Sequence, residues 1–372
     1  GNKNLTWEKT NSLDVGGEVT LFKGLLDFTV DFYEEIRHNI LSSRKIVPAS
    51  MGLGLYPFDN VGKVRSRGMD VSGKIQHAFS NDFWFILNGT ATYNKSVFKE
   101  IEEAADKPEW QGKVGHDISQ VVGYIAEGLF QSQEEIDRSP IQSGNYMPGD
   151  IRYRDVNGDG KIDGGSRSVG TVTDENDPNY GKRDTGDLEV IGNSTPRYEY
   201  GIRLGADYKG FDFSIFMQGV GKRDIWGAGF LAIPGFNTGD GAMPQAIAGN
   251  YWREDRTDAF YPAAYNLAGS NTGFNMQTQD RYLLNMSYFR IKNITLGYTL
   301  PAVWTKKVLI NKARIYVACE NFFTFDKLGG LPIDAEEISG FSMFNSTNYN
   351  SGRTGVGTPT MKNMSVGIQL NF

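Results

Sequence analysis

Acidic and amide side chains alternate with other residues in the segment 155–163. The pattern D-x-N-x-D-G-x-I-D matches positions 1, 3, 5, 6, 8 and 9 of a calcium-binding loop, in which oxygen ligands surround a tight glycine turn. The residues that carry it are Asp155, Asn157, Asp159, Gly160 and Asp163. Position 12 holds Ser166 rather than a carboxylate. A solvated turn rich in Asn-Gly and Asp-Gly has the same composition and is the alternative interpretation.

Aromatic and cationic residues in the long, less regular segments are candidates for contacting a ligand. They are Trp226, Tyr251, Trp252 and Arg253, whose rings and guanidinium group suit sugar rings or carboxylates. Ordinary loop packing is the alternative for each ring. The sequence contains no G-x-S-x-G, G-x-x-x-x-G-K-(S/T), H-E-x-x-H or G-x-G-x-x-G motif, so we expect no catalytic residues and no enzyme.

The composition excludes several classes of protein. Glycine supplies 45 of the 372 residues and aromatics 13%, which favours strands and turns, while 39% hydrophobic residues argue against disorder. The apolar stretches are far shorter than the roughly 18 residues of a membrane helix, so a membrane protein of this sequence would be a barrel. A net charge of −6 without a basic run disfavours nucleic acid as a partner. The single Cys319 excludes a disulfide framework.

Alternation of apolar and polar residues is the main structural signal, and it predicts antiparallel hairpins. The parity of the apolar positions slips near Lys292-Asn293, which predicts a β-bulge. The expected hairpins pair 13–21 with 26–32, 69–79 with 83–93, 198–208 with 211–217 and 286–299 with 313–317, and a last strand covers 364–372.

The connections between these strands alternate between short turns and long loops. Short turns at 23–24, 80–82, 209–210 and roughly 301–311 alternate with loops at about 41–62, 98–196, 222–285 and 326–362. Outer-membrane barrels have this asymmetry, and soluble strands are usually shorter, so we favour a barrel over a soluble β-sandwich. In a barrel one face of each strand meets lipid. That set is Leu13, Val15, Val19, Phe28, Val30, Val366, Ile368 and Leu370, while Thr20 and Thr29 face the lumen.

Several segments are similar to one known family, the SusC/RagA-type TonB-dependent outer-membrane transporters of the Bacteroidetes. The segments are Asn4–Thr10, Asn60–Val64, Pro148–Tyr153 continuing into Asp155–Gly160, Val190–Asn193 with Pro196, Tyr288–Tyr298 and Glu320–Thr324. The terminal Phe372 on an alternating strand resembles the signal read by the barrel assembly machinery.

The resemblance implies an all-β transmembrane antiparallel barrel in the outer membrane, of which residues 1–372 form the C-terminal part. About nine strands of a roughly 22-stranded plugged barrel are expected, with the plug domain and first strands outside this chain. Because an open sheet edge is unstable in lipid, the rest of the transporter is an expected partner. Residues 98–196 are expected as a long extracellular loop region.

In function, the resemblance implies active import of oligosaccharides with a SusD-like lipoprotein, driven by TonB through the missing N-terminal segment. A peptide importer on the same scaffold, a passive porin-like barrel and a soluble glycan-binding β protein are the alternatives.

The resemblance also implies a twelfth-position calcium ligand at Asp187, five residues before Gly192 of the Val-Ile-Gly-Asn segment. Residues from about Gly164 to Arg183 would then be an insertion into the loop, which closes at a slowly growing entropic cost. The expected calcium ligands are the side chains of Asp155, Asn157, Asp159, Asp163 and Asp187 and the carbonyl of Lys161.

Overall fold

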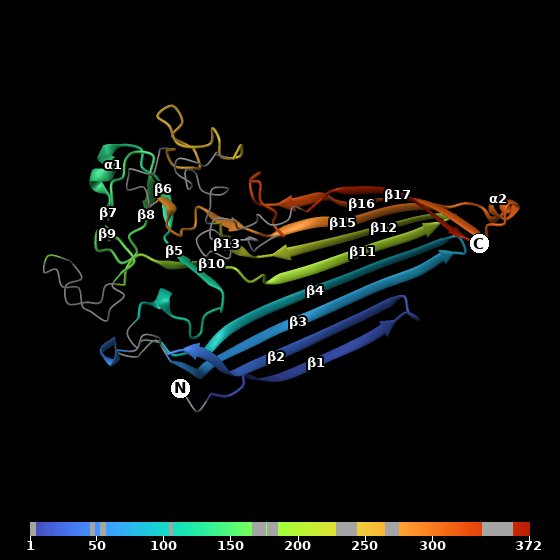
Figure 1. The fold of residues 1–372 in the computed structure, drawn as a ribbon, viewed down its shortest axis with the longest axis horizontal. Coiled ribbons are helices and arrows are strands. Elements are labelled where there is room, and N and C mark those ends of the chain that lie inside the picture. Colours follow the sequence, from blue (N-terminus) through green and yellow to red (C-terminus); the bar gives the residue numbers. More distant parts are fainter. Residues whose placement is uncertain are drawn as a thin grey trace.

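The computed structural model of the chain describes residues 5–44, 49–52, 57–103, 107–165, 176, 185–227, 244–264, 275–336 and 360–372. Its main feature is a nine-stranded antiparallel sheet in which every strand pairs with the next long strand along the chain (Figure 1). The strands are β1 (Lys9–Leu21), β2 (Leu26–Ser43), β3 (Phe58–Ser80), β4 (Phe83–Glu100), β11 (Tyr198–Tyr208), β12 (Phe211–Gly221), β15 (Tyr288–Thr299), β16 (Lys312–Asp326) and β17 (Asn363–Asn371).

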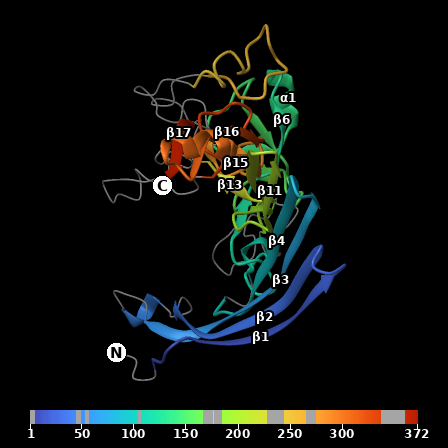
Figure 2. The ribbon, with the colours of Figure 1, turned by 90° about the vertical axis from the view of Figure 1, so that its right-hand side faces the viewer.

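The sheet curves into an open arc rather than lying flat, as Figure 2 shows along the strands. Strands β1 and β17 form its two edges. Every strand but the nine-residue β17 has at least 11 residues, and each is long enough to cross a bilayer as a tilted strand. The predicted hairpins and last strand are confirmed, although β2 and β3 run further than expected and shorten the loop between them to 44–57.

The residues opposite one another in the sheet separate into an apolar and a polar face, because directly paired antiparallel residues point the same way. One apolar row crosses all nine strands: Leu21, Leu26, Ile75, Leu87, Leu204, Ile215, Ile294, Cys319 and Met364. The neighbouring row is polar except at Phe216: Thr20, Asp27, Lys74, Asn88, Arg203, Phe216, Asn293, Glu320 and Asn363. A sheet with this division meets lipid on one face and a polar lumen on the other.

A bulge in β15 preserves the apolar face where the sequence parity slips. Ile291 is opposite Met217 and Asn293 is opposite Phe216, so Lys292 is an extra residue relative to β12. Strand β16 has one further residue relative to β15, because Phe323 is opposite Ile291 and Glu320 is opposite Asn293. Ile291 and Ile294 therefore share the apolar face although they are three positions apart. The predicted bulge is confirmed.

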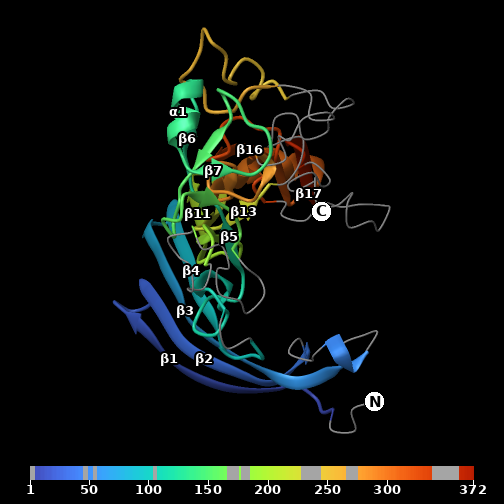
Figure 3. The same ribbon diagram turned by 90° about the vertical axis from the view of Figure 1, so that its left-hand side faces the viewer.

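The connections lie at opposite ends of the sheet according to their length, as predicted. At the short-turn end lie α2 (Ala302–Thr305) and η6 (Lys306–Val308), in the turn between β15 and β16. The other end carries the remaining small elements, most of which gather by the β11–β17 half of the arc, whereas η1 (Ala49–Met51) lies at the ends of β2 and β3 (Figure 3). They are η1 (Ala49–Met51), η2 (Glu109–Gln111), β5 (Gln120–Gly123), β6 (Ala126–Leu129), α1 (Gln133–Arg138), β7 (Ile141–Gln142), β8 (Ile151–Tyr153), β9 (Lys161–Ile162), β10 (Glu189–Asn193), β13 (Asp224–Trp226) and β14 (Leu283–Asn285).

The short strands of the loop end form four two-stranded sheets: β5 with β10, β6 with β8, β7 with β9, and β13 with β14. None of the helices in the described residues has the length and apolar character needed to span a bilayer.

Candidate functional site

A buried apolar cluster organises the loop end of the molecule. It joins segments from three of the long connections, including Tyr153 (1% exposed), Ile247, Tyr282 and Met286. Backbone hydrogen bonds tie these segments together, as where the Tyr124 N–H donates to the Thr278 carbonyl at 2.9 Å. The long loops are therefore packed against one another at this end, which gives a ligand site a rigid base.

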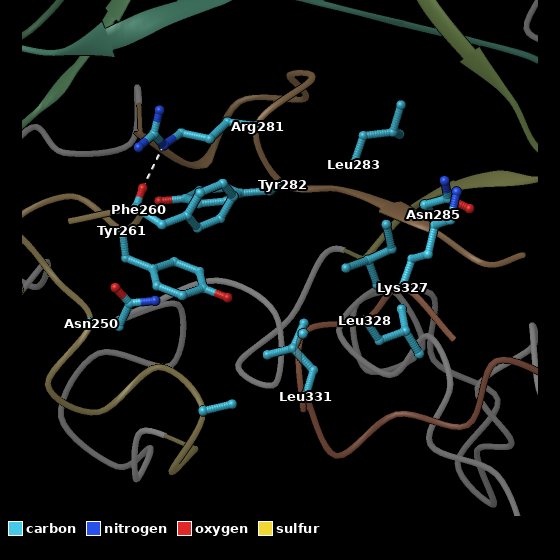
Figure 4. A pocket seen from close by; sticks show the side chains of 13 residues that line it. Asn250, Phe260, Tyr261, Arg281, Tyr282, Leu283, Asn285, Lys327, Leu328 and Leu331 are labelled. Atoms are coloured by element: carbon cyan, nitrogen blue, oxygen red, sulfur yellow. Dashed lines mark hydrogen bonds between the residues drawn. The ribbon is translucent and has the colours of Figure 1, made fainter. Parts of the chain in front are cut away.

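A cavity of about 310 Å³ opens beside this cluster (Figure 4). Among the described residues, three aromatic rings, two amides and two cationic side chains line it together with aliphatic residues, and no carboxylate does. The lining residues are Ala246, Asn250, Phe260, Tyr261, Arg281, Tyr282, Leu283, Leu284, Asn285, Lys327, Leu328, Gly329 and Leu331. A largely apolar hollow with a few convergent polar groups is the usual form of a small-molecule site.

Arg281 is fixed at one wall of the cavity. Its Nε donates to the Phe260 carbonyl at 2.5 Å and its guanidinium lies 4.7 Å from the centre of the Phe260 ring. Burial lowers the pKa of Arg281 below its ordinary value, but the group stays charged at neutral pH. The cavity therefore has a held cation at one side and the exposed Lys327 at the other.

Two stacked tyrosines form the floor of the cavity. The rings of Tyr261 and Tyr282 lie 6.0 Å apart at 27°. The Tyr282 hydroxyl is buried and has no hydrogen-bond partner among the described residues, and burial raises the pKa of both phenols. Such a hydroxyl is an available donor or acceptor for a polar ligand.

The four residues predicted to bind substrate lie beside this cavity rather than in its wall. Trp226 contacts Tyr282, with ring centres 6.3 Å apart, and Tyr251 bridges to Tyr261. Trp252 packs against Gly149, where an added Cβ would lie 2.5 Å from the indole. Trp226, Tyr251 and Trp252 thus support the buried cluster.

Arg253 lies over Tyr251 at 5.9 Å and pairs with Asp255 at 3.1 Å. A direct role in binding substrate stays a prediction for all four residues. Sequence reasoning missed Phe260, Arg281, Tyr282, Asn285 and Lys327. The nearest signal in the sequence is the run 281–285, which directly precedes a predicted strand and lies wholly in the lining.

The predicted calcium loop is a tight turn held by its own side chains. Asp155 accepts hydrogen bonds from the N–H groups of Gly158 at 2.6 Å and Gly160 at 2.9 Å. Asn157 accepts from the Asp159 N–H, and Asp159 accepts from the Lys161 N–H at 2.8 Å. Gly158 and Gly160 have φ of +77° and +81°, a conformation that favours glycine.

Asp187 closes this loop from 24 residues beyond Asp163. One of its oxygens accepts from the N–H of Val156 at 2.8 Å and of Asn157 at 3.4 Å, and the other accepts from the Asp163 N–H at 2.8 Å. Its own N–H donates to the Asp163 carbonyl at 2.9 Å. Asp187 is fully buried, and burial raises its pKa to about 6 against these hydrogen bonds.

The residue types of the loop supply the oxygen ligands that calcium prefers, but the side chains of its described residues are not gathered around one point. Among the described residues no Lys or Arg pairs with the buried Asp187, so a cation would relieve its desolvation. No cluster of three or more Asp, Glu, His or Cys side chains suited to hold a metal ion occurs in the described ranges. Ser166 and nearly all of the proposed insertion 164–183 lie outside the described residues. Calcium ligation stays a prediction.

The segment after β16 is tied to the polar face of the sheet. Arg290, almost fully buried, forms ion pairs with Asp334 and Glu336, and Lys292 pairs with Glu336 at 2.9 Å. Burial raises the pKa of Asp334, but hydrogen bonds from Arg290 and Thr360 outweigh it and hold the pKa below its ordinary value. These contacts hold 334–336 against the β15 wall.

The architecture and the sequence match one family. The family model described as "TonB dependent receptor-like, beta-barrel" matches residues 1–322. The chain belongs to this family. Its nine-stranded sheet is therefore part of the wall of an outer-membrane barrel, as the sequence predicted.

Individual relatives agree with this assignment. TonB-dependent receptor P3 of Formosa agariphila is 23% identical over all of this chain and 35% of its own length. TonB-dependent receptor SusC of Bacteroides thetaiotaomicron is 25% identical over 91% of this chain and 30% of its own length. The structure of the RagAB peptide transporter matches all of this chain and 36% of that chain with a TM-score of 0.68 at 21% identity, which shows the shared fold. The chain spans about a third of the length of these relatives.

Proposed function

We propose that this chain forms the C-terminal wall and outer loops of a TonB-dependent importer of oligosaccharides. A SusD-like lipoprotein covers the loop end, and TonB supplies energy through the N-terminal part of the transporter. The observation that carries the proposal is the cavity at the loop end of a barrel wall, lined by Phe260, Tyr261 and Tyr282 with amides at its rim. Aromatic faces next to amide donors and acceptors suit the apolar faces and hydroxyls of sugars.

A peptide importer is the second candidate, and the charge of the cavity favours it. Arg281 and Lys327 are the charged side chains among the described lining residues, and two cations suit the acidic side chains or C-terminal carboxylate of a peptide. An oligosaccharide bearing uronic acids offers the same carboxylates. The two candidates therefore differ in whether a neutral oligosaccharide binds.

Calorimetric titration of the full-length transporter with a panel of neutral oligosaccharides, acidic oligosaccharides and peptides separates these candidates. We expect binding of at least one oligosaccharide, weakened about tenfold by Asn285→Ala. Arg154→Ala is the matched control, because Arg154 lies at the same end of the molecule, outside the cavity wall, and pairs with Glu127. Arg253→Ala tests the predicted binding residue beside the cavity. Affinity confined to peptides would overturn the oligosaccharide assignment, and an effect of Arg253→Ala alone would move the site away from this cavity.

We also propose that the loop 155–163 with Asp187 binds one calcium ion that orders this part of the extracellular surface. The proposal is supported by the oxygen-rich donor set and by the buried carboxylate of Asp187 within the loop. Calcium titration of the full-length protein should show one site that Asp187→Asn weakens at least tenfold. Asp137→Asn on α1 is the control, and equal affinities in the two variants would refute the site.

A further inference from the structure

The short-turn end of the sheet carries a charge opposite to that of the whole chain. We define the turn end as residues 22–25, 81–82, 209–210 and 301–312. It contains five lysines and one acidic side chain, Asp82, in a chain of net charge −6. The lysines are Lys23, Lys209, Lys306, Lys307 and Lys312, and all five are exposed. This end is therefore a basic surface on an acidic protein.

Each cluster of lysines in the turn end lies beside an exposed aromatic ring. Phe22 precedes Lys23, and the Lys209 ammonium lies 5.3 Å from the centre of the Tyr208 ring. Trp304 is two residues before Lys306. A ring next to a lysine at the end of a membrane strand is suited to the boundary between hydrocarbon and head groups.

The turn between β15 and β16 exposes far more apolar surface than a turn in water needs. Val303, Trp304, Val308 and Leu309 are 73%, 61%, 65% and 87% exposed. The exposure is not an effect of an open sheet edge, because β15 and β16 both have partner strands on each side. Backbone hydrogen bonds hold this turn in place, from the Ile310 N–H to the Thr305 carbonyl and from the Asn311 N–H to the Asn371 carbonyl.

The apolar turn continues the aromatic belt of the apolar face. Stacked and edge-on rings link His77, Phe79, Phe83 and Tyr208 at this end, with centres 4.6 to 6.0 Å apart. Phe211 and Tyr298 add a second contact at 4.5 Å. Short turns of outer-membrane barrels lie on the periplasmic side, where the adjacent leaflet consists of phospholipid.

We propose that the turn end binds anionic phospholipid head groups of the periplasmic leaflet. Lys306 and Lys307 pair with lipid phosphates, and the apolar side chains of 303–309 insert between the head groups. Apolar insertion and lysine–phosphate attraction together give interfacial binding, as in amphipathic membrane-surface helices. The proposal depends on the barrel orientation and is independent of the transported substrate.

Native mass spectrometry of the full-length transporter tests the charge part of this proposal. The protein is taken from nanodiscs holding equal amounts of phosphatidylglycerol and phosphatidylcholine, and the retained lipids are counted. Lys306→Gln with Lys307→Gln should lower retained phosphatidylglycerol several-fold and leave phosphatidylcholine unchanged. Lys113→Gln with Arg138→Gln removes two exposed cations at the loop end and should retain lipids as the wild type does. Unchanged phosphatidylglycerol in the turn variant would overturn the proposal.

Fluorescence quenching tests the insertion of the turn. The emission lost in Trp304→Phe identifies the fluorescence of Trp304. Lipids brominated on the upper acyl chain should quench this fluorescence, and aqueous iodide should leave it unchanged. A fluorophore at Leu309→Cys, in a Cys319→Ser background, gives an independent signal that needs no change at Trp304. Quenching of both probes by iodide and not by brominated lipid would show a surface facing the periplasm, suited to a soluble protein, and would refute lipid binding.

Discussion

Two adjacent residues of β2 provide a direct test of which face of the sheet meets lipid. Val30 is opposite Gly17 and Val71 on the apolar face, whereas Thr29 is opposite Glu18 and Ser72 on the polar face. Val30 is four residues from the start of β2, which at ~3.4 Å per residue and a tilt of ~40° places it about 10 Å into the apolar band. That band is about 25 Å tall, so Val30 lies near its middle.

An arginine at Val30 should therefore be much more harmful than an arginine at Thr29. Arg at the bilayer midplane destabilises a barrel by about 2–4 kcal/mol, or roughly 30- to 700-fold in the folding equilibrium. Thr29→Arg places the guanidinium opposite Glu18 in a wet lumen, where we expect a change within about 1 kcal/mol. The assay is guanidinium unfolding of the full-length protein in phospholipid vesicles, followed by its folded band on semi-native gels. Equal losses of stability for Val30→Arg and Thr29→Arg would refute the assignment of faces.

Three further predictions concern the loop end. Gly123→Ala should destabilise it by about 1–3 kcal/mol, because the new Cβ would lie 2.5 Å from the Thr278 carbonyl oxygen, whereas Gly89→Ala in open space should have little effect on the thermal midpoint. The pKa of Asp187 is about 6 in the folded loop against ~3.9 in the unfolded chain, so the folded loop binds a proton more tightly and loses stability as that proton leaves. Without calcium, protease resistance of 155–187 should therefore fall as the pH rises from 4 to 6 and stay low above that. Calcium should restore resistance above pH 6 and have little effect below pH 4, and a flat pH profile would contradict this. Arg290→Met removes the buried cation that pairs with Asp334 and Glu336, so limited proteolysis should cut near 334–336 faster. Arg314→Met is the control: it breaks the pair with Asp212 at the other end of the sheet and should not change this cleavage.

The barrel wall was predictable from sequence because it depends on local alternation. Phe213, Ile215 and Met217 of β12 are opposite Leu296, Ile294 and Ile291 of β15, and this alternation is interrupted at the Lys292 bulge. The extra length of β2 and β3 was missed because their outer ends alternate poorly, with Asn39 at a φ of +58° and a register shift before Ile40.

The cavity could not be predicted, because its wall joins residues from two separate connections, the one between β12 and β15 and the one after β16. Packing of the long loops brings Phe260, Tyr282 and Lys327 together, and such packing leaves no periodic pattern in the sequence from which it could be predicted. Trp252 was predicted to contact substrate because it is an aromatic residue in a long connection. In the structure it packs against the buried cluster beside the cavity. The proximity of Asp187 to the loop 155–163 followed from the family resemblance rather than from spacing, since 24 residues separate it from Asp163.

The most direct test of the proposed function is uptake by cells that lack the gene for the full-length transporter. A panel of labelled oligosaccharides and peptides is supplied to the deletion strain, to the strain with the gene restored and to a strain without TonB. We predict that uptake of at least one oligosaccharide is lost on deletion, returns with the gene and stays lost without TonB. Loss confined to peptides, or oligosaccharide uptake that persists without TonB, would contradict the account.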